Sequence, residues 1–231
     1  QVVNSHDPKA GIVANKIFGN FSYPTQDTPN PIGSYAKGCL GGGIELPKTG
    51  PTWQVMNPSR NRNWGHPKAI SFVKRLSEGA QDIGWAGLYI GDISQPRGGP
   101  MGYGHKSHQI GLDVDIWLKP AKKMNLTLDE LKQISPISIR TKDLRSVNQN
   151  WTVNHMKILK IAALDKAVDR IFITAPAKIE MCKKAGKDRD LLKGDLDEDF
   201  VRSGHMYKSL TYKVTDPKTV TAAYKKWKAG N

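Results

Sequence analysis

The sequence predicts an α+β protein with a mainly antiparallel central sheet flanked by helices. Its 231 residues are enough for one sizeable core, and 38% hydrophobic with 24% charged residues is typical of a soluble globular chain. Segments of helical and of strand periodicity alternate irregularly, which favours α+β over a regular βαβ order. We therefore expect a single domain over residues 1–231.

The expected elements begin with an irregular N-terminal segment, because residues 1–50 are rich in Gly, Pro, Asn and Ser and show no sustained periodicity. Apolar spacing predicts a helix over 67–81 and strands over 87–93 and 111–118. Later elements are a short helix at 126–133 with Thr127 as N-cap, a helix at 152–167 with Thr152 as N-cap, a strand at 168–174, a helix at 177–185 ending at Gly186, and an exposed charged loop at 187–199.

The segment Gln95–Leu118 gathers most of the residues that carry chemistry. His105 and His108 lie three residues apart in a glycine-rich stretch, and Asp115 follows seven residues after His108. Histidine and aspartate are both good Zn²⁺ ligands. Apolar residues alternate with Asp113, Asp115 and Trp117, which predicts a half-buried strand with both aspartates on one face. Taken alone, the same residues also fit surface histidines and solvated aspartates.

The surrounding residues resemble a known family. The pattern Gly-His-x-Ser-His-x-x-Gly-Leu-Asp-x-Asp-Ile-Trp over 104–117 is similar to that of the penicillin-insensitive murein endopeptidases. These enzymes belong to the zinc metallopeptidase superfamily of lysostaphin, the D-Ala-D-Ala carboxypeptidases and hedgehog. Further segments resemble the same family, and together they cover roughly residues 19–187: 33–40, 59–67, 95–101 and 151–186.

The resemblance implies a catalytic Zn²⁺ with His108 and Asp115 as ligands. It also implies that His105 and His205 form an acid/base and hydrogen-bonding pair, for which the alternative is that they only orient the ligands. Arg97 is a candidate for binding a substrate carboxylate, and a structural turn arginine is the alternative.

The C-terminal segment departs from the family pattern. The family supplies its third ligand as the second histidine of a His-x-His pair that follows a Gly-His-x-Tyr motif. Here Gly204-His205-Met206-Tyr207 is followed by Lys208-Ser209-Leu210, so both histidines of the pair are absent. A shift of the late strand would make His205 the third ligand.

Other histidines and both cysteines have less specific interpretations. His66 is expected to be structural or to line the cleft, and His155 to lie on a helix surface. Cys39 and Cys182 are too far apart in the sequence for a local metal site, and either pairing or free thiols fit the sequence.

The formal net charge of +14 bears on partners rather than on fold. No zinc-finger, helix-turn-helix or RNA-binding signature accompanies it, so nucleic acid is not expected. An anionic wall polymer is a candidate partner, and a solvated basic surface is the alternative. No apolar run is long enough to span a membrane. A start at Gln1 without Met fits a secreted protein after removal of its leader, and an arbitrary boundary of the sequence is the alternative.

Two functions are thus predicted. The first is a periplasmic zinc endopeptidase that cuts D-alanyl–meso-diaminopimelate cross-links in peptidoglycan. The second is a non-catalytic relative that binds peptidoglycan or another anionic wall polymer, having lost the third zinc ligand.

Overall fold

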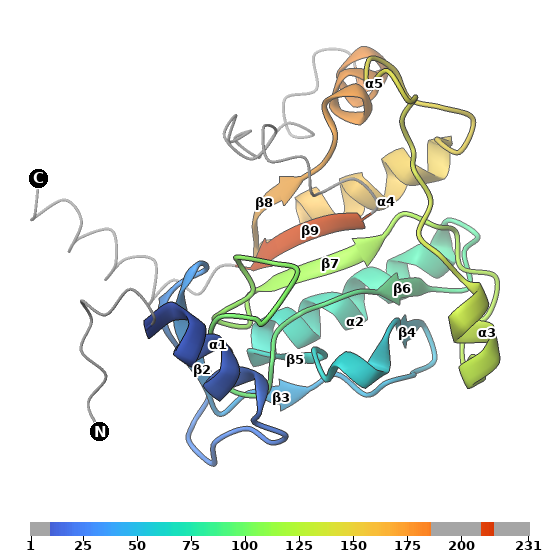
Figure 1. Ribbon diagram of the computed structural model, residues 1–231. Helices are drawn as coiled ribbons and strands as arrows, with labels where there is room; N and C mark the ends of the chain where they lie inside the picture. The colour runs from blue at the N-terminus through green and yellow to red at the C-terminus, as the bar shows by residue number, and fades with distance from the viewer. Residues whose placement is uncertain (1–9, 186–208, 215–231) are drawn as a thin grey trace, which may run out of the picture.

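The computed structural model describes residues 10–185 and 209–214, and all that follows concerns this part of the chain. Its central element is a five-stranded sheet with the strand order β4-β6-β7-β9-β8 (Figure 1). These strands are β4 (Trp53–Val55), β6 (Leu88–Ile90), β7 (Asp113–Trp117), β8 (Val168–Phe172) and β9 (Ser209–Val214). The pairing of β4 with β6 is parallel and the other three pairings are antiparallel, so the expected α+β class and mainly antiparallel sheet are confirmed.

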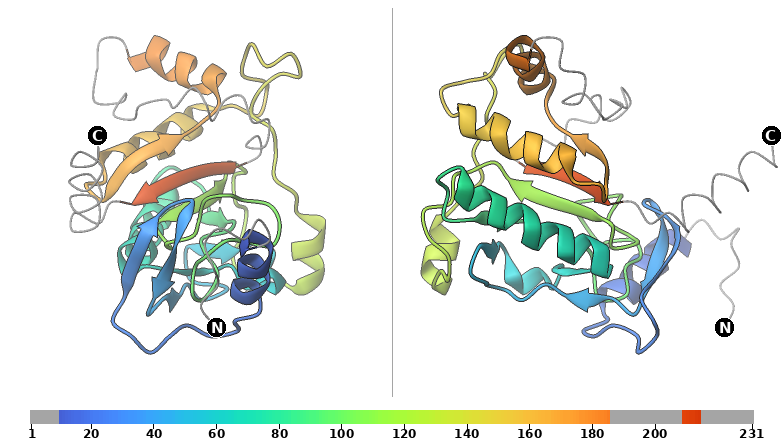
Figure 2. Two further views of the ribbon diagram at one scale, coloured as in Figure 1. Left: turned by 60° about the vertical axis from the view of Figure 1, so that its left-hand side comes forward. Right: turned by 180° about the vertical axis from the view of Figure 1, so that it is seen from behind.

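Helices cover one face of this sheet. They are α2 (Pro67–Asp82) and α4 (Val153–Leu164), seen behind the sheet in Figure 1 and in front of it in the right-hand view of Figure 2. The helix predicted at 67–81 is therefore confirmed. Phe72 and Val73 of α2 pack with Ile158 of α4 and with Val114 and Ile116 of β7 in the main hydrophobic core.

The opposite face of β7 carries the polar residues. Because side chains alternate along a strand, Asp113, Asp115 and Trp117 share that face. Trp117 packs there with Met56 and Tyr89 in a second, smaller cluster. The strand was predicted to be half-buried, and this is wrong: every residue of β7 is buried, and Asp115 is only 4% exposed. The loop before β7 and the segment that follows it cover the second face, which periodicity alone does not reveal.

The N-terminal segment is more regular than its composition predicts. It forms α1 (Ala10–Gly19) and a hairpin of β1 (Asn30–Ser34) and β2 (Lys37–Gly41), which lie at one end of the sheet (Figure 1). A short pair, β3 (Ile44–Glu45) with β5 (Trp64–Gly65), follows.

The remaining helices lie close to where they are predicted. The helix α3 (Leu128–Gln133) begins at Thr127, whose side chain and that of Glu130 form a reciprocal capping box. The helix α5 spans Ala175–Ala185, and its predicted cap at Gly186 and the loop 187–199 lie outside the described residues. Cys39 and Cys182 are both free thiols.

His155 corrects one sequence-based expectation. It was predicted on a helix surface but is fully buried. Its Nδ1 accepts a hydrogen bond from the backbone N–H of Thr152 at 3.1 Å, at the start of α4, and its Nε2 lies 2.9 Å from the carbonyl oxygen of Leu118. The ring packs against Trp85 and Trp151. These contacts join α4 to the end of β7.

Candidate metal centre

The glycine-rich loop between β6 and β7 brings the histidines to the sheet. Its turns require glycine: Gly98 has φ of 63°, and a Cβ there would collide with the carbonyl oxygen of Gln109. Gly111 has φ of 68°, and a Cβ there would meet the side chain of Leu40 and the backbone of His66. The loop therefore folds back against the domain and enters β7 directly.

His108 is held by bonds to its backbone and to its ring. Its backbone N–H donates to Asp113 Oδ2 at 2.9 Å, and its carbonyl accepts from the Ser94 hydroxyl. Its φ of 68° is unusual for a non-glycine residue, and such strain is concentrated at functional sites. The ring Nδ1 lies 2.8 Å from the carbonyl oxygen of Ile93. Because a carbonyl only accepts, Nδ1 carries the proton and the lone pair of a neutral ring is on Nε2.

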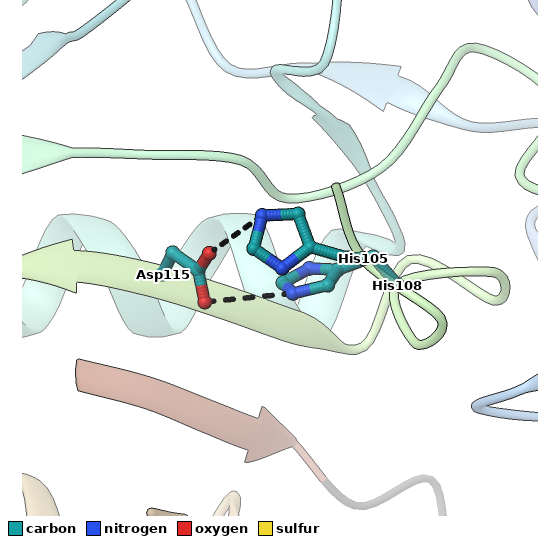
Figure 3. Close-up of side chains that lie close together, drawn as sticks. All are labelled: His105, His108 and Asp115. Atoms are coloured by element: carbon teal, nitrogen blue, oxygen red, sulfur yellow. Dashed lines mark ion pairs between the residues drawn. The ribbon is translucent and has the colours of Figure 1, made fainter. Parts of the chain in front are cut away.

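Three potential ligands converge at this point, as Figure 3 shows. His108 Nε2 lies 3.4 Å from Asp115 Oδ1, and His105 Nε2 lies 3.3 Å from Asp115 Oδ2. One donor atom from each of the three residues lies within 4.8 Å of the others. Two imidazole nitrogens and a carboxylate oxygen match the ligands that Zn²⁺ prefers, and three protein ligands are the usual number at a catalytic zinc. The residues present therefore fit this ion.

The electrostatics of the cluster favour cation binding. Burial alone would lower the pKa of His108, but the charge of Asp115 and the hydrogen bond that the imidazole donates to it raise that pKa to about 9. The metal-free imidazole is therefore protonated at neutral pH, and its proton occupies the place that a metal would take.

Asp92 contacts the cluster through His105 and is paired with Arg62. Neither residue was predicted from the sequence. Asp92 lies two residues past β6 and is 3% exposed. Its Oδ2 accepts from Arg62 Nη1 at 2.8 Å and lies 3.4 Å from His105 Nε2. Burial would raise the pKa of Asp92, but the hydrogen bonds from His105 and Arg62 hold it well below its usual range. The carboxylate of Asp92 is thus ionised and lies next to the His105 ring.

A pocket of about 360 Å³ opens beside the cluster. Asp115, Asp92 and His105 line one side of it. Its other walls come from the Asn57–Arg60 turn, from Trp117, and from the segment 131–136 at the end of α3. A metal held by the cluster would therefore face a space large enough for part of a peptide.

Comparison with known proteins gives the chain its family. The sequence model of the penicillin-insensitive murein endopeptidases matches residues 31–202, most of the chain. The chain belongs to this family. The murein endopeptidase of Haemophilus influenzae is 38% identical over 170 residues, which is 73% of this chain and 59% of the relative. That of Yersinia enterocolitica is 37% identical over 182 residues, which is 78% of this chain and 66% of the relative. The chain thus spans about three fifths to two thirds of the length of these relatives.

The late strand β9 of this murein endopeptidase family member lies beside β7, which carries Asp115. In the register of β7 with β9, Asp115 is opposite Thr211 and Ile116 is opposite Leu210. His205 lies outside the described residues, so its expected roles as acid/base partner or third ligand stay predictions.

Arg97 and His66 have other contacts. Arg97 Nε donates to the carbonyl oxygen of Tyr23 at 3.2 Å, and its guanidinium lies 3.9 Å from the centre of the Phe21 ring. It is not among the described residues that line the pocket. His66 is the N-cap of α2, where its Nδ1 accepts from the Lys68 N–H at 3.3 Å. None of the helices in the part of the chain that the structure describes is long and apolar enough to cross a bilayer.

Proposed function

We propose that this protein is a zinc metallo-endopeptidase that hydrolyses D-alanyl–meso-diaminopimelate cross-links of peptidoglycan in the periplasm. The observation that carries the proposal is the convergence of His105, His108 and Asp115 at the edge of a pocket, in a chain of the murein endopeptidase family. The relatives from Haemophilus influenzae and Yersinia enterocolitica are named as penicillin-insensitive murein endopeptidases.

His108 and Asp115 are the proposed zinc ligands. His108 presents Nε2 because its Nδ1–H is bound to the Ile93 carbonyl, and Asp115 is fixed by its buried position in β7. When bound, Zn²⁺ supplies a Lewis acid that polarises a carbonyl and lowers the pKa of water to about 7. The protein contributes positioning, because it holds the two donors on one strand and the loop before it.

His105 has two proposed roles that one experiment separates. Its Nε2 is near enough to the other donors to serve as third ligand. The family resemblance instead implies that it carries a proton between the attacking water and the leaving amine, a task that its 30% exposed side chain beside the pocket permits. If His105 is a ligand, His105→Ala loses zinc. If it only carries protons, the variant keeps zinc and loses cleavage.

The test of the activity is digestion of purified cross-linked muropeptide dimers with added Zn²⁺. The parent protein is expected to release monomers, and His108→Ala is expected to leave dimers intact. Metal content after dialysis is measured for both proteins and for His105→Ala, so that loss of metal is distinguished from loss of proton transfer.

A second candidate is a non-catalytic peptidoglycan-binding relative. The observation that favours it is the sequence Lys208-Ser209-Leu210, which places no histidine where the family has its pair. Leu210 lies within β9, opposite Ile116, and leucine cannot bind a metal. Intact dimers together with retained binding of the parent protein to sacculi would support this candidate.

A further inference from the structure

The pocket beside the metal cluster contains two basic side chains to which neither the family resemblance nor the zinc site assigns a role. Arg60 and Lys132 both line this pocket. Lys132 is 76% exposed and forms an ion pair with Asp129 at 3.0 Å. Arg60 is 37% exposed, and the one ion pair that it forms within the described residues, with Asp92 Oδ2, is long at 3.5 Å. Of the two, Arg60 has the charge that is less fully neutralised.

The charge on Asp92 is already balanced by another residue. Arg62, which is 5% exposed, binds the same oxygen at 2.8 Å and also donates to the Tyr103 carbonyl at 3.0 Å. Arg60 is therefore not required to neutralise Asp92. A guanidinium has five N–H donors, and of those on Arg60 only Nη1 has a hydrogen-bond partner within residues 10–185 and 209–214, so the others can bind a ligand.

Local hydrogen bonds hold the backbone around Arg60 in a tight turn. Residues Pro58–Arg60 form a single 3-10 turn, flanked by Asn57 and Asn61, both in the left-handed region with φ of 56° and 52°. The N–H of Arg60 donates to the Asn57 carbonyl at 3.0 Å, and Asn61 Oδ1 accepts from Trp64 Nε1 at 2.7 Å. A left-handed residue at each end of one turn is an unfavourable backbone that persists only where its surroundings hold it, and such sites often bind ligands. The turn thus fixes the position of Arg60 before a ligand arrives.

The distance to the metal cluster limits what Arg60 can bind. Arg60 Nη1 and His105 Nε2 lie 3.5 Å and 3.4 Å from the same oxygen of Asp92, so they are no more than about 7 Å apart. In the proposed substrate, the amide nitrogen that is released belongs to a diaminopimelate carbon that also bears a free carboxylate. That carboxylate is two bonds of about 1.5 Å each from the scissile nitrogen. A carboxylate so close to the reacting bond falls within the reach of Arg60.

We infer that Arg60 binds the free carboxylate next to the scissile amide, on the amine side of the cross-link, and thereby sets substrate specificity. Guanidinium and carboxylate match in two parallel N–H···O bonds, which position a ligand as well as attract it. This inference rests on the proposed endopeptidase function. It assigns the carboxylate to Arg60 rather than to Arg97, which is bound to Tyr23 and Phe21.

The experiment compares two cross-linked muropeptide dimers that are identical except at this group, which is a carboxylate in one and a carboxamide in the other. Arg60→Gln is expected to lower kcat/KM for the carboxylate dimer by roughly 10- to 100-fold, mainly through KM, and to change the carboxamide dimer by less than about threefold. Arg60→Lys is expected to be intermediate, because it keeps the charge but not the bidentate geometry. Arg75→Gln is the control, since Arg75 pairs with Asp165 outside the pocket.

A binding measurement keeps the inference separate from the proposed activity. Calorimetry with the metal-free protein and the two amine-side product peptides is expected to show tighter binding of the carboxylate peptide, and Arg60→Gln is expected to abolish the difference. If the parent protein cleaves neither dimer, the proposed function fails and the binding comparison alone decides the role of Arg60. Three outcomes would overturn the inference. The parent protein could bind both peptides equally, or Arg60→Gln could lose the same factor in kcat/KM with both dimers. The third is a selective loss for the carboxylate dimer in Arg97→Gln and not in Arg60→Gln.

Discussion

Replacement of His155 by alanine tests whether a buried imidazole joins α4 to the sheet. The substitution removes the acceptor of the Thr152 N–H and the donor to the Leu118 carbonyl, leaving two backbone groups without these partners. It also opens a cavity between Trp85 and Trp151. Lost hydrogen bonds and the cavity together should lower the free energy of unfolding by about 4 kcal/mol. For a chain of this size, that lowers Tm by roughly 8 to 16 °C.

The assay is urea unfolding of the parent and of His155→Ala in the same metal-free buffer. Val153→Ala, two residues away on the same helix and 61% exposed in the parent, is the matched control and should change stability by less than about 0.5 kcal/mol. A loss below about 1 kcal/mol in His155→Ala would refute the reasoning that these hydrogen bonds and ring contacts stabilise the junction.

The pH dependence of stability gives a second test of the role of His155. Burial lowers the pKa of His155, and the hydrogen bond to Leu118 offsets this only in part. The unfolded chain therefore binds the proton more readily than the folded one, and the stability that His155 contributes is present above its ordinary pKa of about 6.5 and is lost as the pH falls. The difference between parent and variant should shrink from pH 7.5 to pH 5. If the stability difference between parent and variant instead grows on acidification, the folded protein does not hold His155 as a neutral ring protonated at Nε2.

Three further predictions concern the metal cluster and its supports. Arg62→Ala should lower the free energy of unfolding by about 3 kcal/mol in urea unfolding, because the buried carboxylate of Asp92 loses its shortest ion pair. An unchanged unfolding midpoint would show that Arg60 and His105 replace Arg62 as partners of Asp92. Because the pKa of metal-free His108 is raised to about 9, zinc affinity should rise roughly tenfold per pH unit up to that pH. Calorimetry in buffers of different ionisation enthalpy should detect the released proton, and pH-independent binding argues against the protonated state. Gly98→Ala should destabilise the protein by about 1–3 kcal/mol in thermal unfolding, whereas Gly102→Ala, where a Cβ meets nothing within 4 Å, should be neutral.

Local patterns in the sequence were sufficient to predict the elements that form the site. Helical spacing identified α2, and alternation identified β7 with Asp113 and Asp115 on one face. The predicted proximity of His108 and Asp115 is confirmed by the 3.4 Å between their side chains. These features depend on residues close together in the chain, which is why periodicity and spacing reveal them.

Features that depend on distant residues were not predictable in this way. His155 was expected on the surface because its partners at Trp85 and Leu118 are far away in the sequence. Asp92 gave no signal of its own, although its place near the end of the predicted strand at 87–93 and the two arginines at 60 and 62 were visible. Only the folded chain shows that Arg60 and Arg62 both contact the same carboxylate oxygen of Asp92. The roles of Arg97 and His205 stay predictions.

The position of β9 has a consequence for how the chain is made. Residues 209–214 pair on both sides, with 113–117 and with 168–172, so the strand of this sheet that is synthesised after the other four lies inside the sheet and not at its edge. Until it arrives, two strands present open edges, and open edges are where chains pair with one another by mistake. A chain that stops before residue 209 would still contain His105, His108 and Asp115, yet the strand bearing Asp115 would lack a neighbour. The segment that contributes none of the described metal donors thus closes the sheet edge beside Asp115 and blocks its pairing with another chain.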